Sequence, residues 1–189
     1  RDWSSDVCSS DLRVVTVACD EQGNIDVADL ELKIEKHADR LAALMVTYPS
    51  THGVFEEAIR TVCDMVHTAG AQVYMDGANM NALMGVARPG DMGADILHVN
   101  LHKTFSTPHG GGGPGAGPLA VTEQLEKYLP SPRMVEKDGK LDWEYDRPDS
   151  IGPVRSFYGN FGILVRAWAY MKACGGDGLT EVTRMAVLA

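Results

Sequence analysis

Hydrophobic positions along the chain follow two spacings, one typical of buried strands and one typical of helices. Continuous apolar runs of strand length cover residues 41–48, 72–76, 95–101 and 118–122. Between the first two runs, Ile59, Val62, Cys63 and Val66 repeat at helical spacing, and Gly70 follows them. Strand, helix and strand joined by short connections form a βαβ unit, so the pattern predicts an α/β fold with a mostly parallel sheet.

Further elements are predicted before and inside this unit. Residues 14–18 are a short β-branched run that predicts a strand, and residues 26–38 predict a helix capped by Asp26. The run 41–48 has the composition of a strand that is buried on both faces. Residues 56–57 are two glutamates, which we expect in the first turn of the following helix, where carboxylates suit the helix dipole.

The chain changes character after residue 129. Residues 130–153 contain four prolines, and Asp138-Gly139 predicts a hairpin turn within them. Residues 161–174 predict an apolar helix that ends at Gly175, with a second helix after Asp177. We therefore divide the chain into a non-native leader without periodicity (1–12), part of a large domain (13–129), a connecting segment (130–160) and the truncated start of a C-terminal helical region (161–189).

Composition narrows the classes of function. The 189 residues are 44% hydrophobic, and 17 Lys and Arg stand against 26 Asp and Glu, a net charge of −9. Without a clustered basic face, nucleic acid and membrane partners are disfavoured. No apolar run approaches 18 residues. Four widely spaced cysteines without a CxxC pair are expected to be reduced thiols in the cytoplasm.

The candidate chemistry gathers around Lys103. It follows the apolar run 95–101, so we expect its amine to be partly dry, to lose its proton easily and to act as a nucleophile. Glycines at 110–113 and 115 can bring several backbone N–H groups close to a phosphate. A nucleophilic amine beside a phosphate cradle indicates pyridoxal phosphate.

Asp76 and Ala78 fit the same cofactor. They are two residues apart at the end of a predicted strand, so we expect both on one side. A carboxylate there keeps the pyridine nitrogen protonated, and a small apolar side chain packs on the ring. Because ligands of open α/β sheets bind at the carboxyl ends of the strands, Asp76, Lys103 and Thr47-Tyr48 are expected to share one crevice.

Each signal has a plainer interpretation. A lone Asp at a strand end is more often a turn or cap residue, and a lone Lys after a strand is usually solvated. His98, His102 and His109 can be ordinary loop or core histidines, and for His98 we prefer that interpretation. The ordered set of Asp76, Lys103 and glycines favours a functional site.

Four longer motifs carry a resemblance to a known family. They are residues 47–55 (TYPSTHGVF), 75–82 (MDGANMNA), 100–105 (NLHKTF) and 108–115 (PHGGGGPG). Together they resemble the P-protein of the glycine cleavage system, a decarboxylating glycine dehydrogenase. The resemblance extends over residues 13–188, and residues 154–162 are more similar to the second subunit of the two-subunit form than to the single long chain.

The resemblance implies a fold and a set of site residues. The fold is that of fold-type I pyridoxal-phosphate enzymes, which are aspartate-aminotransferase-like with three αβα layers, and residues 13–129 are then part of the cofactor-binding domain. Lys103 matches the lysine that binds the cofactor covalently, Asp76 the partner of the pyridine nitrogen, and Ala78 a residue packed on the ring. His102 is expected near the cofactor or the substrate carboxylate.

Weaker assignments complete the implied pocket. Thr51, His52, Gly112 and Gly113 are expected to line it, with the glycine run serving a neighbouring subunit. Ser106 stands where some members carry cysteine, which removes any thiol chemistry proposed for that position. The family's ring-stacking histidine and main phosphate loop are expected upstream, so these 189 residues alone are expected to be inactive.

The implied reaction is the decarboxylation of glycine, with transfer of the aminomethyl group to the lipoyl group of H-protein. The implied partners are lipoylated H-protein and the other P-protein subunit, in a heterotetramer or pseudo-dimer. One alternative is another fold-type I enzyme, such as an amino-acid decarboxylase or a hydroxymethyltransferase. Another is a phosphate-loop nucleotide binder, although the glycine run lacks the Gly-Lys-Ser/Thr ending. Lys103 argues against a third, a non-catalytic partner subunit.

Overall fold

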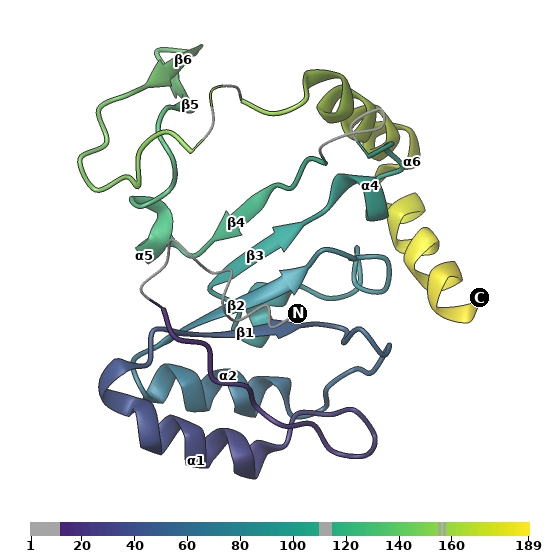
Figure 1. Cartoon of the computed structure of the whole chain (residues 1–189). Coiled ribbons are helices and arrows are strands. Elements are labelled where there is room, and N and C mark those ends of the chain that lie inside the picture. The colour runs from purple at the N-terminus through teal and green to yellow at the C-terminus, as the bar shows by residue number, and fades with distance from the viewer. Residues whose placement is uncertain (1–11, 110–114, 155, 157) are drawn as a thin grey trace.

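The computed structural model describes residues 12–109, 115–154, 156 and 158–189 (Figure 1). Helices and strands alternate along most of the chain, as the sequence predicts. In chain order the elements are α1 (Val27–His37), the 3-10 helix η2 (Ala38–Arg40), β1 (Ala43–Thr47), α2 (Ile59–Thr68), β2 (Gln72–Gly77), α3 (Pro89–Met92), β3 (Ile96–Val99), α4 (Leu101–Thr104), β4 (Leu119–Val121), α5 (Glu123–Glu126), β5 (Arg133–Lys137), β6 (Lys140–Glu144) and α6 (Phe161–Leu188).

The main sheet has four strands in the order β1-β2-β3-β4. β1, β2 and β3 are parallel, and β4 returns antiparallel along the edge of β3. The register places Thr47 opposite Asp76 and Asp76 opposite His98. The mostly parallel sheet of the prediction is therefore confirmed, and the carboxyl ends of three parallel strands meet at one end of the sheet.

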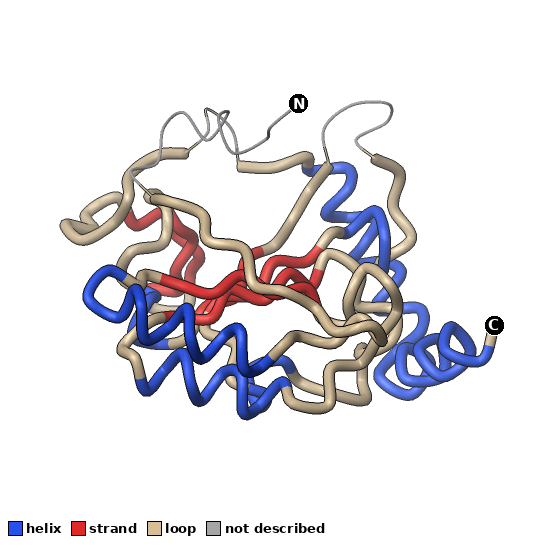
Figure 2. Tube along the Cα trace, turned by 60° about the horizontal axis from the view of Figure 1, so that its bottom comes forward, coloured by secondary structure: helices blue, strands red, loops and turns tan. Residues whose placement is uncertain are grey.

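Helices α1 and α2 cover one face of this sheet (Figure 2). Val73 and Met75 of β2 point toward this face and are fully buried. They pack in one core cluster with Ile59, Cys63 and Val66, which lie on α2 at the spacing that the sequence predicted. Burial of this apolar stripe between helix and sheet is the main stabilising contribution in the domain.

The opposite face of the sheet is open among the described residues. Met45 in β1 is 67% exposed, and the flanking Ala43 and Thr47 are exposed as well. The prediction that residues 41–48 are buried on both faces is therefore wrong for the described chain. The physical reason is that α1 and α2 lie on one side only, so alternate side chains of β1 have nothing to pack against.

The segment before α1 differs from the prediction. Residues 14–18 form no strand, because the described chain gives them no neighbouring strand to pair with. The backbone N–H of Ala18 instead donates to Asp29 Oδ2 at 2.7 Å, which holds the segment against α1. The predicted cap is confirmed, since Asp26 accepts a hydrogen bond from the N–H of Asp29.

The two glutamates before α2 are also placed differently from the prediction. α2 begins at Ile59, so Glu56 and Glu57 precede its first turn. The side chain of Glu56 is buried, and it accepts hydrogen bonds from the N–H groups of Ala58 and Ile25. Glu56 therefore works as a link between the start of α2 and the turn before α1.

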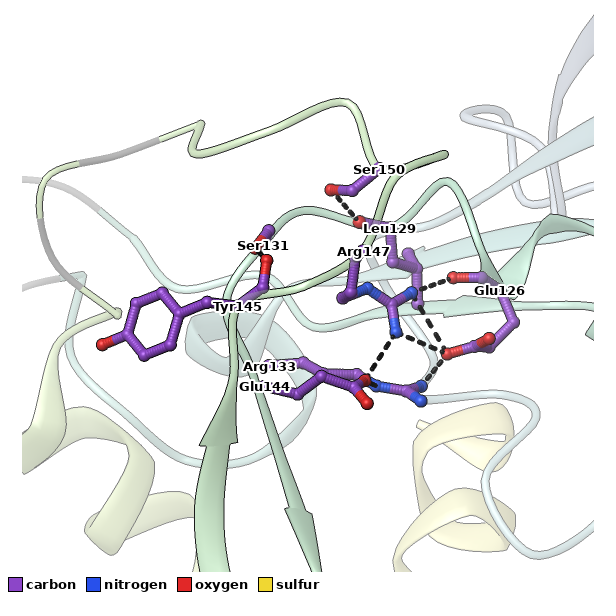
Figure 3. A network of polar contacts seen from close by, with 8 residues as sticks. All are labelled: Glu126, Leu129, Ser131, Arg133, Glu144, Tyr145, Arg147 and Ser150. Atoms are coloured by element: carbon purple, nitrogen blue, oxygen red, sulfur yellow. Dashed lines mark hydrogen bonds and ion pairs between the residues drawn. The ribbon is translucent and has the colours of Figure 1, made fainter.

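A polar network ties the β5–β6 hairpin to α5 (Figure 3). The side chain of Arg147 is only 6% exposed, and it contacts Glu126 and Glu144, each at 3.2 Å. Arg133 forms ion pairs with the same two glutamates. The predicted hairpin turn is confirmed, with Asp138 and Gly139 both at positive φ, as a tight two-residue turn requires.

Helix α6 contains the break that the glycines predict. Gly175 has φ of 63° and ψ of −177°, which divides α6 into two helical parts. In the first part, Ile163 and Ala167 pack on Leu101 of α4. In the second part, Thr183 donates from Oγ1 to the carbonyl of Met84 at 2.7 Å. Across the described ranges, no helix is long and apolar enough to cross a membrane.

Candidate functional site

Lys103 lies on a single helical turn that follows β3. The strand ends at Val99, and the N–H of Asn100 donates to the carbonyl of Ala78 at 3.3 Å. α4 then begins at Leu101, so the predicted strand 95–101 is too long at its carboxyl end. Lys103 therefore sits one turn beyond the strand end at which the sequence placed it.

The amine of Lys103 is not in a dry environment. Its side chain is exposed, and no hydrogen bond or ion pair engages it within the described part of the chain. The predicted partial desolvation is wrong here, because the described residues leave the open end of the sheet uncovered. The unpaired amine is nevertheless accessible for a covalent bond to a carbonyl group.

Thr104 fixes the turn that carries Lys103. Its side chain is buried, and Oγ1 accepts a hydrogen bond from the N–H of Met80 at 2.8 Å. Met80 lies in the segment that follows Asp76 and Ala78. The carboxyl ends of β2 and β3 are thus joined by one side-chain bond and by the bond from Asn100 to Ala78. The sequence analysis did not predict this role of Thr104. The one feature that pointed to it was its position next to Lys103 in the chain.

Asp76 and Ala78 take the arrangement expected of a strand end. Asp76 Oδ1 accepts a hydrogen bond from the N–H of Ala78 at 2.8 Å, and Ala78 is buried. Gly77 between them faces the helix side, where a Cβ atom would lie 2.5 Å from Leu97 Cδ1. Glycine is required at this position for β2 and β3 to pair closely, which keeps Asp76 on the open face.

His98 lies beside Asp76, which the sequence interpretation did not anticipate. The two residues are register partners in β2 and β3, and His98 Nδ1 is 3.3 Å from Asp76 Oδ1. On its other side, His98 Nε2 is 3.2 Å from Asn100 Oδ1. The sequence interpretation treated His98 as an ordinary strand histidine. The predicted pairing of β2 with β3 was the one signal that could have placed it beside Asp76.

His102 packs in a small cluster after β3. Its ring centroid lies 4.2 Å from that of His109, and a Cβ atom on Gly115 would come within 2.8 Å of the ring. Partial burial lowers the pKa of His102, and the nearby His109 and Lys103 lower it further. The imidazole is therefore neutral at pH 7. Its Nδ1 is buried and has no hydrogen-bond partner among the residues that the structure describes, and the same holds for Oγ1 of Thr107.

The remaining predicted pocket residues are less closely connected. Thr51 and His52 lie in an exposed turn after β1, and no described hydrogen bond or ion pair joins either of them to Asp76 or Lys103. Their role stays a prediction. Gly112 and Gly113 lie outside the described residues.

Comparison with known sequences identifies close relatives. Residues 4–140 match the family described as "Glycine cleavage system P-protein". A glycine dehydrogenase (decarboxylating) from Nostoc punctiforme is 54% identical over 94% of this chain, which spans 18% of that relative. A probable glycine dehydrogenase (decarboxylating) subunit 2 from Bacillus licheniformis is 53% identical over 92% of the chain, which spans 35% of it.

Comparison with solved structures establishes the fold. A cysteine desulfurase from Thermococcus onnurineus superposes with a TM-score of 0.63 at 20% identity, over 96% of this chain and 44% of that one. Mouse CSAD in its apo form superposes with a TM-score of 0.58 at 22% identity, over 88% of this chain and 35% of that one. The predicted fold class is confirmed: the chain has part of the fold-type I α/β architecture.

The family match covers β1 to β4, α4 and most of the hairpin, so it includes Asp76, Ala78 and Lys103. It favours the resemblance found in the sequence over a phosphate-loop nucleotide binder and over a different fold-type I enzyme. This chain belongs to the glycine cleavage system P-protein family.

Proposed function

We propose that this chain is part of an enzyme that decarboxylates glycine with pyridoxal phosphate and transfers the aminomethyl group to the lipoyl group of H-protein. The observation that carries the proposal is the family match over residues 4–140, since the relatives are named glycine dehydrogenase (decarboxylating). The site geometry supports it, because Asp76 and Lys103 lie at the carboxyl ends of neighbouring parallel strands.

The described residues fit the cofactor in their chemistry. Within the described part of the chain, no partner competes for the amine of Lys103, and no group bonds the carboxylate oxygen Oδ2 of Asp76. Two further polar atoms within four residues of Lys103 in the chain, His102 Nδ1 and Thr107 Oγ1, are buried and have no partner among the described residues. Buried polar atoms normally form hydrogen bonds, so these two atoms suit a polar ligand at this end of the sheet.

Each of these residues has a distinct task in the proposed reaction. When bound, pyridoxal phosphate supplies a ring that takes up the electron pair left behind as the carboxyl group departs as CO₂. Asp76 keeps the proton on the ring nitrogen, and the methyl group of Ala78 offers an apolar surface to the ring. Lys103 Nζ would hold the cofactor covalently and, when released, would be placed to move a proton to or from the substrate.

His102 is suited to orient the substrate. A neutral imidazole has one N–H donor, which can bond the carboxylate of glycine without adding a second cation beside Lys103. The lowered pKa of His102 keeps the ring in this form at pH 7. Thr104 supports both residues, because its buried hydroxyl fixes α4 against the segment that carries Ala78.

The partners follow from the same proposal. Lipoylated H-protein is the acceptor of the aminomethyl group, and the subunit 2 name of the Bacillus licheniformis relative supports a second P-protein subunit. We place the enzyme in the cytoplasm, as a heterotetramer or pseudo-dimer whose glycine run serves a neighbouring subunit's site. The pocket roles of Thr51, His52, Gly112 and Gly113 belong to this proposal as well.

The test is made on the full-length protein with its partner subunit, pyridoxal phosphate and lipoylated H-protein. We expect exchange of glycine carboxyl with bicarbonate in the wild type and none in Lys103→Ala. Borohydride reduction followed by peptide mapping should place the pyridoxyl group on Lys103.

Lys127→Ala is the matched control, because Lys127 is also exposed but pairs with Asp149 far from the strand ends. It should retain both exchange and labelling. A pyridoxyl group on Lys127 or Lys137 instead of Lys103 would contradict the assignment, and absence of exchange with correct labelling would point to another fold-type I reaction.

A further inference from the structure

His98 lies on the open face of the sheet, next to the candidate site, and has no task in the mechanism above. It lies directly opposite Asp76 in the parallel pairing of β2 with β3, so both side chains project from the same face. Its Nδ1 is 3.3 Å from Asp76 Oδ1, so the imidazole lies next to the carboxylate proposed to bind the cofactor.

The surroundings of His98 limit the hydrogen-bond partners of its two ring nitrogens. Nδ1 is sealed from solvent and meets no well-aligned hydrogen-bond acceptor among the described residues. Nε2 is 3.2 Å from the side-chain amide of Asn100. A Cβ atom on Gly117 would lie 3.5 Å from both the His98 ring and the Asn100 amide, so the backbone at Gly117 covers this pair.

With the proton of the neutral ring on Nδ1, that N–H lies on the side of Asp76 Oδ1, at 3.3 Å but out of line for a hydrogen bond. Nε2 then accepts from Asn100 once the amide is turned so that its nitrogen faces the ring. The opposite tautomer would set the lone pair of Nδ1 against a carboxylate oxygen, which is repulsive. His98 therefore stands between two polar side chains, with Asn100 at Nε2 and Asp76 at Nδ1.

Both contacts to the carboxylate use the same oxygen. Oδ1 accepts from the N–H of Ala78 at 2.8 Å and faces His98 Nδ1, whereas no described group engages Oδ2. Two contacts on one oxygen fix the rotation of the carboxyl group and leave the other oxygen free.

We propose that His98 is a positioning residue for Asp76: together with the Ala78 amide it holds Oδ1, so that Oδ2 is the oxygen available to the cofactor's ring nitrogen. The inference rests on the proposed function, and Asn100 supports it by fixing the His98 ring. His98 touches neither substrate nor cofactor in this scheme and acts only through the carboxylate.

The chain offers a matched set of variants. His98→Asn retains a nitrogen donor close to the position of Nδ1, whereas His98→Gln retains one only near the position of Nε2. His98→Leu removes both. Comparison of Asn with Gln therefore isolates the contact to Asp76 from the contact to Asn100 at nearly equal polarity and size.

The measurements are made on the full-length protein loaded with pyridoxal phosphate labelled with ¹⁵N at the ring. In His98→Gln and His98→Leu we expect the ¹⁵N resonance to move toward that of the unprotonated ring, and the Kd of the cofactor to rise about tenfold, the value of one hydrogen bond to a charged group. His98→Asn should restore both values to near those of the wild type. Melting temperatures of the apo proteins report any general loss of structure.

The outcomes separate this inference from the proposed function. A wild-type protein that forms no reducible bond with the cofactor would overturn the function itself. A wild type that binds normally, with His98→Gln unchanged in ¹⁵N resonance and Kd, would overturn only the role of His98. Equal losses in the Asn, Gln and Leu variants would show a structural role in the sheet and would also overturn it.

Discussion

Replacing Asp95 with alanine should loosen the start of β3, the strand that leads to His98 and Lys103. The Asp95 side chain is only 8% exposed, and its Oδ2 accepts a hydrogen bond from the N–H of Val73 at 2.7 Å. The same oxygen lies 2.7 Å from Nε2 of His67 on α2. One carboxylate thus ties β2, β3 and α2 together at the end of the sheet opposite the candidate site.

The magnitude follows from these two contacts. The bond from the buried Val73 amide to a charged acceptor is worth about 2 kcal/mol, and its loss leaves that N–H without a partner. The contact with His67, whose side chain is 36% exposed, adds about 1 kcal/mol. We therefore expect Asp95→Ala to destabilise this region by about 3 kcal/mol, and Asp95→Asn, which retains an oxygen for Val73, by about 1 kcal/mol.

The assay is native-state hydrogen exchange on the full-length protein, read on peptides that cover Gln72–Gly77. A loss of about 3 kcal/mol speeds exchange of the protected amides about 150-fold, and a loss of about 1 kcal/mol speeds it about fivefold. His67→Ala is the control, because it removes only the weaker contact and should resemble Asp95→Asn. Equal exchange in Asp95→Ala and Asp95→Asn would refute the importance of the Val73 bond.

Three shorter predictions test other parts of the structure. Asp76→Asn should still bind the cofactor but should lose about three orders of magnitude in glycine–bicarbonate exchange, since a weaker electron sink raises the barrier by roughly 4 kcal/mol; near-normal exchange would make Asp76 structural. Burial raises the pKa of the Cys63 thiol from 9.0 to about 11, so iodoacetamide should label the exposed Cys19 before Cys63. The free energy of unfolding should be constant below pH 9 and should fall as the pH rises from 9 to 11 in the wild type, and Cys63→Ala should not show this fall. Arg147→Met should destabilise the β5–β6 hairpin by about 2 kcal/mol, because it removes the bridge from Arg147 to Glu126 and Glu144 while Arg133 still pairs with both; unchanged exchange of the hairpin amides would exclude that role.

The elements that the sequence predicted correctly are those in which a single local pattern decides the outcome. The apolar stripe of α2, the Asp26 cap and the Asp138-Gly139 turn all occur where their residues indicate. Each depends on neighbours within one or two turns of the chain. The strand predicted for residues 14–18 is wrong because it depends on a distant partner. β-branched residues favour a strand only where another strand is present to pair with.

The candidate site was predictable in its residues but not in its connections. Asp76 and Lys103 could be named from their types and their order along the chain. The contact between His98 and Asp76 could not, because it depends on which residue of β3 lies opposite which residue of β2. The exposure of Lys103 depends on what covers the open face, which local patterns do not encode.

The order of the strands has a consequence for how this part of the protein is made. β1, β2, β3 and β4 lie side by side in the sheet in the order in which the ribosome produces them. Each of these four strands can therefore add to the edge formed by the one before it, and none of the four has to be inserted between two others. Synthesis and sheet growth can run in the same direction, so the carboxyl ends that carry Asp76 and Lys103 are brought together by the addition of a single strand.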